Sequence, residues 1–177
     1  MNVFVLCTGR CGSVTFAEAC KHITNFTTGH ESHVKCRGAA RVAYPENHIE
    51  VDNRLIWFTG ALYKRYGKGA LYVHLIRNEE DTAASFAKRA DGGIIAAYRD
   101  SILLRCPGKI SDINICKDYC QTVNENIRYF LHDKPNQITI HIETAGKTFP
   151  VFWDAIGAAG NMSAALRELK VRHHRSV

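Results

Sequence analysis

Hydrophobic positions along the chain are grouped so that strands and helices are predicted in alternation. Short, nearly continuous apolar runs at Val3–Leu6 and Ala70–Ile76 are typical of strands buried inside a parallel sheet. Gln137–Ile142 alternates and is rich in β-branched residues, which also predicts a strand. We therefore expect an α/β fold, a single three-layer α/β/α domain over residues 1–177 with a mainly parallel central sheet.

Between these runs, apolar residues recur at helical spacing. Leu55 and Leu62 share one helical face, and Asp52 is a suitable N-cap for that helix. Two other segments have weaker patterns: residues 25–28 are expected to form a second strand, and residues 48–51 an extended entry to the next helix. We predict helices over residues 14–22, 52–65, from 79 onward, 113–132, 148–156 and 162–169.

The turn after the first predicted strand reads Thr8-Gly9-Arg10-Cys11-Gly12-Ser13. A strand, a tight turn and a helix in succession point several backbone N–H groups at one spot, which suits a phosphate or sulfate group. Gly9 and Gly12 omit side chains where an anion must approach, and Arg10 adds a positive charge. For this loop alone, an ordinary strand–helix turn that needs its glycines only for geometry is an equally good interpretation.

The charge of the chain favours an anionic partner. Its 177 residues carry a net charge of +6, which suits nucleic acid, an acidic lipid surface or a multiply phosphorylated small molecule. No block of like charges occurs before the C-terminal tail, so a nucleic-acid-binding arm is not indicated. No apolar run approaches the roughly 20 residues of a membrane span, and no signal peptide is recognisable. We expect no membrane insertion and a cytoplasmic location, with the seven cysteines reduced.

A second candidate for anion binding follows the strand at residues 70–76. Arg77 lies at the carboxyl end of this strand, and Ser85 lies two turns into the helix predicted to follow. Ligands of open α/β sheets bind beyond the carboxyl ends of the strands, so the two side chains could grip one anion from two sides. Alternatively, Arg77 pairs with an acidic residue of the segment 79–81, and Ser85 faces solvent.

Together, the two stretches resemble the sulfotransferases that use 3′-phosphoadenosine-5′-phosphosulfate (PAPS). The loop Thr8–Ser13 is similar to the phosphosulfate loop of that family, which has Lys or Arg, a small residue, Gly, and then Ser or Thr. Arg77 and Ser85 are separated as in the family's 3′-phosphate motif. The chain departs from the family at Val14, which replaces a second hydroxyl residue, and at Glu79, which replaces a usual Pro.

The resemblance extends to the segment Gly29–His33. Glu31 lies where tyrosylprotein sulfotransferases and related bacterial enzymes place a catalytic Glu, after the second strand, and its separation from Arg10 agrees. The chain from Phe152 to His174 also resembles small bacterial sulfotransferases. The similarity is weakest between residues 90 and 118.

The resemblance implies a P-loop NTPase-like fold and a sulfuryl transfer from PAPS to an acceptor hydroxyl. The product would be 3′-phosphoadenosine 5′-phosphate (PAP), and no metal would be needed. Glu31 would take the proton of the acceptor, with His30 and His33 as alternative bases. Arg10 would neutralise the charge that grows on the leaving oxygen.

The resemblance also implies which residues bind the donor. Backbone amides of residues 9–14 would hold the 5′-phosphate, and Arg77 with Ser85 would hold the 3′-phosphate, which distinguishes PAPS from ATP. The donor-binding residues implied are Thr8, Gly9, Arg10, Cys11, Gly12, Ser13, Val14, Arg77 and Ser85.

Two other functions stay open. A nucleotide-dependent P-loop kinase needs GxxxxGK[ST], whereas here Ser13 follows Gly12 and the cation precedes it. A non-catalytic module that binds anions or nucleic acid is the other alternative.

For a sulfotransferase, we expect a small molecule or a glycan as acceptor and no nucleic acid. Residues 32–47 and 90–109 are expected to line its site. The basic tail 172–175 is either a solvated end or a further contact to donor phosphates. The oligomeric state is not predicted.

Overall fold

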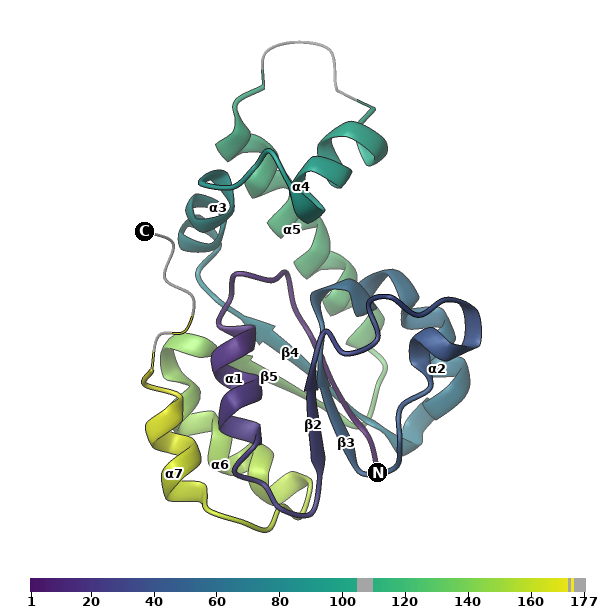
Figure 1. The fold of residues 1–177 in the computed structure, drawn as a ribbon, viewed down its shortest axis with the longest axis vertical. Coiled ribbons are helices and arrows are strands. Elements are labelled where there is room, and N and C mark those ends of the chain that lie inside the picture. Colours follow the sequence, from purple (N-terminus) through teal and green to yellow (C-terminus); the bar gives the residue numbers. More distant parts are fainter. Residues whose placement is uncertain (105–109, 172, 174–177) are drawn as a thin grey trace.

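The computed structural model describes residues 1–104, 110–171 and 173. Over these residues the chain forms a five-stranded sheet in the order β2-β3-β1-β4-β5, with all neighbours parallel (Figure 1). The expected α/β fold with a parallel central sheet is confirmed. The strands are β1 (Val3–Leu6), β2 (Thr27–His30), β3 (His48–Val51), β4 (Leu71–Ile76) and β5 (Gln137–His141).

Helices connect the strands. The α-helices of the described ranges are α1 (Ser13–Cys20), α2 (Thr59–Tyr66), α3 (Glu79–Ala87), α4 (Gly93–Ala97), α5 (Asp112–Leu131), α6 (Ala145–Ala155) and α7 (Met162–Glu168). The 3₁₀ helices there are η1 (Gly38–Val42), η2 (Asn53–Phe58), η3 (Gly67–Gly69) and η5 (Ile142–Thr144), and a π-helical turn, η4, spans Tyr98–Ile102. Within the described ranges, no helix combines the length and the apolar character that a membrane crossing requires.

Alternate side chains of the strands enter two separate hydrophobic cores. Val3 and Val5 of β1 pack with residues of α1, α6 and α7, whereas Phe4 and Leu6 pack on the opposite face with residues of α2, α3 and α5. All four side chains are fully buried, because β1 is the central strand and helices cover both faces. Figure 1 shows the resulting three layers.

Two strands differ from the sequence prediction. The second strand spans Thr27–His30 rather than 25–28, so that Gly29 and His30 belong to the sheet rather than to a loop. Residues 48–51 form a complete strand, paired on both sides with β2 and β1. Its apolar positions alternate with His48 and Glu50, whose side chains form a buried polar cluster, so the strand lacks a continuous apolar run.

The helix predicted over 52–65 is divided into two parts. Asp52 caps its start as expected, because its carboxylate accepts a hydrogen bond from the Arg54 amide at 2.7 Å. The helix that begins there is η2, of 3₁₀ type, and α2 begins only at Thr59. The unassigned segment after residue 92 contains α4 and η4.

All strands of the sheet point the same way, so their carboxyl ends meet at one edge. The β1–α1 loop, the start of η2 and the start of α3 follow directly from three of these ends. Figure 1 shows α3 and α4 beyond this edge, on the side to which the β1–α1 loop reaches. In parallel α/β sheets, this edge is where ligands bind.

Candidate active site

The β1–α1 loop turns through several left-handed backbone conformations. The φ angles are +81° at Gly9, +54° at Arg10 and +85° at Gly12. A Cβ atom on Gly12 would lie 2.6 Å from Cγ1 of Ile142, and one on Gly9 would lie 2.9 Å from Nδ2 of Asn53. Both glycines are therefore required by backbone conformation and by close packing.

The first turn of α1 faces a cavity. Gly12, Ser13, Val14 and Thr15 line that cavity, and no side chain of the described residues caps the N-terminus of the helix. The first backbone N–H groups of an α-helix have no partner inside the helix, so this end is suited to an anion.

Two residues of the loop point away from the cavity. Cys11 is fully buried in the core that contains α1, and Thr8 is buried with its hydroxyl bonded to the Gly9 carbonyl at 2.8 Å. The Thr8 carbonyl in turn accepts hydrogen bonds from Asn53 Nδ2 at 3.3 Å and from the Tyr119 hydroxyl at 3.0 Å. The side chains of Thr8 and Cys11 therefore anchor the loop and do not reach the cavity.

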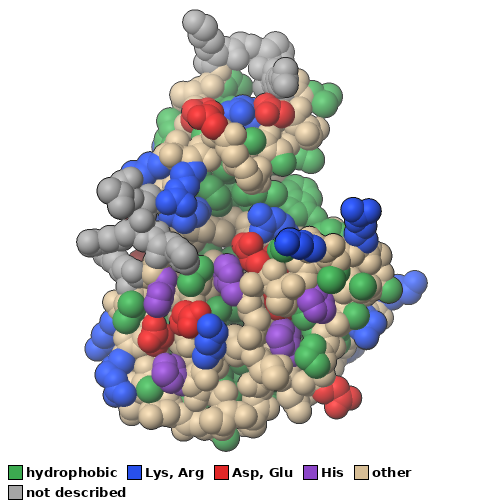
Figure 2. Space-filling model, viewed as in Figure 1, with side chains coloured by type: hydrophobic (Ala, Val, Ile, Leu, Met, Phe, Trp, Pro, Cys, Tyr) green, Lys and Arg blue, Asp and Glu red, His purple; other side chains and the backbone are tan. Residues whose placement is uncertain are grey.

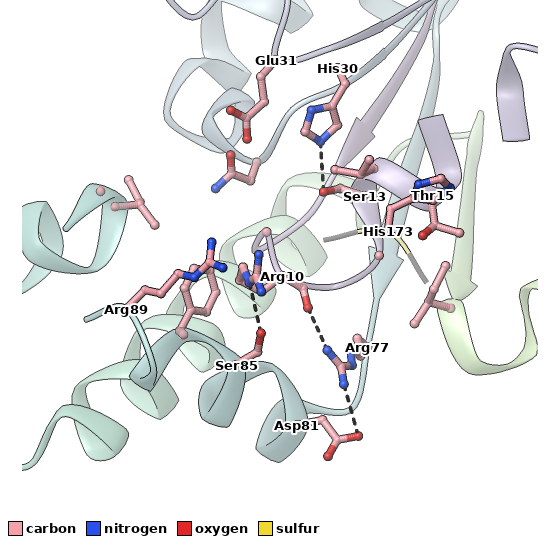
Figure 3. A pocket seen from close by; sticks show the side chains of 18 of the residues that line it. Arg10, Ser13, Thr15, His30, Glu31, Arg77, Asp81, Ser85, Arg89 and His173 are labelled. Atoms are coloured by element: carbon pink, nitrogen blue, oxygen red, sulfur yellow. Dashed lines mark hydrogen bonds and ion pairs between the residues drawn. The ribbon is translucent and has the colours of Figure 1, made fainter. Parts of the chain in front are cut away.

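The two candidate anion-binding stretches meet in space. Arg10 Nε donates to the Ser85 hydroxyl at 3.0 Å, and Arg77 Nη1 donates to the Arg10 carbonyl at 3.1 Å (Figure 3). The alternative pairing of Arg77 with an acidic residue is present in a loose form, since Nη2 lies 3.8 Å from Asp81 Oδ2. Ser85 bonds Arg10, which differs from the alternative in which it only faces solvent.

A third guanidinium group, that of Arg89, joins this cluster. Arg89 follows Ser85 by one helical turn, lines the same cavity and lies beside Arg10 in Figure 3. Partial burial, together with the charges of Arg89 and Arg77, lowers the pKa of Arg10 from its ordinary value. Within the described part of the chain, no carboxylate lies at ion-pair distance from Arg89. Positive charges held close together in this way favour binding of an anion.

Glu31 lies across the cavity from these arginines. Its backbone has φ of +51°, and its amide donates to the Val51 carbonyl at 3.0 Å. Its carboxylate accepts a hydrogen bond from Arg54 Nη1 at 2.7 Å, and both side chains are about one-third exposed, at 33% and 37%. The carboxylate is therefore ionised, accessible and held on one side.

The two alternative bases occupy different places. His30 lines the cavity, with Nε2 at 3.1 Å from the Ser13 hydroxyl (Figure 3). His33 stacks on Tyr44 at 4.3 Å between ring centroids, and its Nδ1 is buried without a hydrogen-bond partner among the described atoms. Of the two histidines, His30 is therefore the one that reaches the site.

The cavity joins all these groups and has a volume of about 1140 Å³. Figure 2 shows a hollow on this face between the body of the molecule and the part above it, with Lys or Arg side chains at its margin. The charged residues that line the cavity are Arg10, Glu31, Arg54, Arg77, Asp81, Lys88, Arg89, Glu143 and Lys170. Cations outnumber carboxylates in this lining, so the cavity suits a ligand with several negative charges.

Some lining residues were not predicted. Asn53 and Arg54 follow β3 directly, and recognition of residues 48–51 as a strand would have placed them at the ligand-binding edge. The spacing of Arg89 from Ser85, i to i+4 on a helix, is the signal that could have identified it. Of the two segments expected to bind the acceptor, 92–95 line the cavity, whereas 32–47 contribute no lining residue among those described.

The C-terminal segment closes one side of the cavity. Leu169, Lys170, Val171 and His173 line it, and the Thr15 hydroxyl donates to the Val171 carbonyl at 3.1 Å. His173 Nε2 lies 2.6 Å from a carboxylate oxygen of Glu168. The other residues of the basic tail, 172 and 174–175, lie outside the described residues.

Among the described residues, no cluster of three or more His, Cys, Asp or Glu side chains is arranged to hold a metal ion.

Comparison with known proteins adds one informative similarity. No protein-family model matches the chain, and no curated protein matches it in sequence. Among solved structures, the chain is similar to the crystal structure of mouse sulfotransferase SULT7A1 complexed with PAP, with a TM-score of 0.63 and 15% identity. The similarity covers 96% of this chain and 63% of that one. The chain therefore has a sulfotransferase-type fold and spans somewhat less than two thirds of the length of that protein.

Proposed function

We propose that this chain is a sulfotransferase that moves a sulfuryl group from PAPS to an acceptor hydroxyl. The observation that carries the proposal is the convergence of Arg10, Arg77 and Ser85 beside the N-terminus of α1, in one cavity with Glu31. The cavity thus holds two separate places for phosphate, as a donor with a 5′-phosphosulfate and a 3′-phosphate requires. The fold shared with a sulfotransferase crystallised with PAP supports this assignment.

In this proposal, the donor phosphates lie on opposite sides of Arg10. The first turn of α1 and the backbone of Gly9 to Gly12 hold the 5′-phosphate through N–H groups. Arg77 and Ser85 hold the 3′-phosphate, and Arg89, which lies beside Arg10, adds a further positive charge. Val14 lacks a hydroxyl, so its contribution is limited to its backbone.

The transfer itself needs a base and a cation. Glu31 takes the proton of the acceptor hydroxyl as the acceptor oxygen forms a bond to sulfur. The bond from sulfur to the phosphate oxygen breaks, and Arg10 neutralises the charge on that oxygen as PAP leaves. Arg10 bonds Ser85 in the structure, so this role requires the guanidinium to turn from Ser85 toward the leaving oxygen.

The acceptor would enter between Glu31 and α4. The backbone of Gly92 and Gly93 and the side chains of Ile94 and Ile95 line this part of the cavity. We propose a small molecule or a glycan with a free hydroxyl, since one carboxylate base serves either.

Thermal-shift and calorimetric titrations with PAP test the proposal. PAP should raise the melting temperature, because a ligand that binds only the native state stabilises it. ATP with magnesium should raise it far less. No shift at saturating PAP contradicts the proposed donor, and a larger shift with Mg-ATP would favour the kinase alternative. Transfer is then measured with labelled PAPS and a panel of phenols, alcohols and sugars.

A further inference from the structure

A fully buried carboxylate lies against the turn that carries Glu31. Glu50 belongs to β3, and none of its surface is exposed. Its Oε1 accepts a hydrogen bond from the Ser32 amide at 2.8 Å, and its Oε2 accepts one from the Ser32 hydroxyl at 2.5 Å. Glu50 thus fixes both the backbone and the side chain of the residue that follows Glu31.

His48 completes the set of bonds to this carboxylate. His48 Nε2 lies 3.0 Å from Glu50 Oε2, and His48 Nδ1 lies 2.8 Å from the Thr27 hydroxyl. A carboxylate only accepts, so Nε2 carries the proton, and in the neutral ring Nδ1 accepts from Thr27. Hydrogen bonds from His48 and Ser32 hold the pKa of Glu50 below its ordinary value, although burial opposes the charge.

The strand that leads to Glu31 is shaped around Glu50. A Cβ atom on Gly29 would lie 2.5 Å from Glu50 Oε2 and 3.0 Å from the Ser32 hydroxyl oxygen. Only glycine leaves room for the carboxylate at this position. The carboxylate, the glycine and the serine therefore form one packed unit on both sides of Glu31.

Glu31 itself has a backbone conformation that needs support. Its φ of +51° is uncommon for a residue with a side chain, and such conformations persist where the surroundings hold them. The hydrogen bond from its amide to Val51 fixes one side of the residue, and the bonds from Ser32 to Glu50 fix the other. Together they present the Glu31 carboxylate to the cavity and to Arg54.

We propose that Glu50 is a positioning residue for the reaction: through Ser32, it holds Glu31 in the orientation that accepts the proton of the acceptor. The inference rests on the proposed function. Glu50 is not among the described residues that line the cavity, so it acts through Glu31 rather than on the acceptor. A misplacement of about 1 Å at a reacting group can lower turnover roughly 100-fold, so a buried support of this kind affects rate.

The test compares Glu50→Ala, Glu50→Gln and Ser32→Ala with the exposed control Glu46→Ala. Glu50→Ala is expected to lower kcat about 100-fold while the KM for PAPS and the affinity for PAP change less than about twofold. Glu50→Gln keeps an oxygen that accepts from the Ser32 amide and is expected to restore most of the rate. Ser32→Ala removes one of the two bonds and is expected to lower kcat about tenfold.

A readout that does not depend on turnover is hydrogen exchange of the residue 32 amide. It should be faster in Glu50→Ala than in wild type or Glu46→Ala, measured on PAP-free protein by NMR. The inference is overturned if Ser32→Ala and a folded Glu50→Ala keep kcat within twofold of wild type, or if PAP affinity falls in parallel with kcat. Failure of the proposed function is seen separately, as absence of a PAP-induced shift in the wild-type protein.

Discussion

Arg10 Nε donates to the Ser85 hydroxyl at 3.0 Å, although the two residues are 75 positions apart in the chain. This bond joins the loop after β1 to the helix after β4, which are neighbours because β1 and β4 pair in the sheet. A guanidinium group and a hydroxyl that both suit an anion thus satisfy each other here. An anion bound between them would replace this bond by two charge-assisted bonds of its own.

Arg77 is expected to supply much of the affinity for PAP. Arg77→Ala removes a guanidinium that lies within the cavity and also loses its bond to the Arg10 carbonyl. Hydrogen bonds to charged groups contribute about 1.5–3 kcal/mol, so the Kd for PAP should rise roughly 10-fold to 100-fold. Isothermal titration calorimetry measures this change.

Arg65→Ala is the matched control for Arg77→Ala. Arg65 is an exposed arginine of α2 that lies over the Tyr66 ring and is not among the described lining residues. Its replacement should leave the Kd for PAP within about twofold, apart from weak long-range electrostatics. Equal losses in the two variants would show that net charge, rather than the site, determines binding.

Glu31→Gln should separate donor binding from transfer. The substitution keeps the shape of the side chain and removes its basicity, so PAP affinity should stay near that of wild type. Turnover should fall about 100-fold to 10,000-fold, the usual contribution of a general base. Rates are measured with labelled PAPS, and Glu125→Gln on the exposed face of α5 is the control.

Retained turnover in Glu31→Gln would transfer the role of base to a histidine. His30 lies in the cavity, whereas His33 stacks on Tyr44. His30→Asn should then abolish the remaining rate.

The parts of the fold that the sequence predicted well are those with apolar side chains on both faces. β1 and β4 have continuous apolar runs because helices cover both sides of the sheet. β3 was not recognised as a strand because His48 and Glu50 face a polar cluster that only tertiary contacts create. A local pattern does not reveal that a Glu two residues before the strand end is bonded to a turn 18 positions earlier.

The candidate site follows the same rule. Arg77 and Ser85 could be placed together because strand ends of a parallel sheet share one edge. The bond of Arg10 to Ser85 and the ion pair of Glu31 with Arg54 could not be predicted, because they depend on side-chain rotamers and on the order of strands. Thr8 and Cys11 belong to the loop by sequence, yet their side chains enter the core.

Gly12 is expected to tolerate no side chain. Gly12→Ala combines φ of +85° with a contact of 2.6 Å to Ile142, so both strain and packing oppose it. The free energy of unfolding should fall by more than about 1 kcal/mol, and the Kd for PAP should rise. Gly60→Ala is the control: it lies in α2 with open space around it and should stabilise the chain by about 0.5–1 kcal/mol. Urea unfolding measures both values.

His74 should make the folded chain less stable in mild acid. It is buried on β4, its Nε2 lies 3.1 Å from Asn124 Oδ1, and burial lowers its pKa from 6.5 to about 4. Below pH 6.5 the unfolded chain therefore binds a proton that the folded chain refuses, and stability falls as the pH falls toward 4. From pH 7 to pH 5 this single group should cost about 2 kcal/mol. Urea unfolding of the wild type and of His74→Gln at both pH values measures the cost. The variant does not titrate at this position and should lose about 2 kcal/mol less than the wild type; equal losses would contradict a neutral His74 in the folded chain.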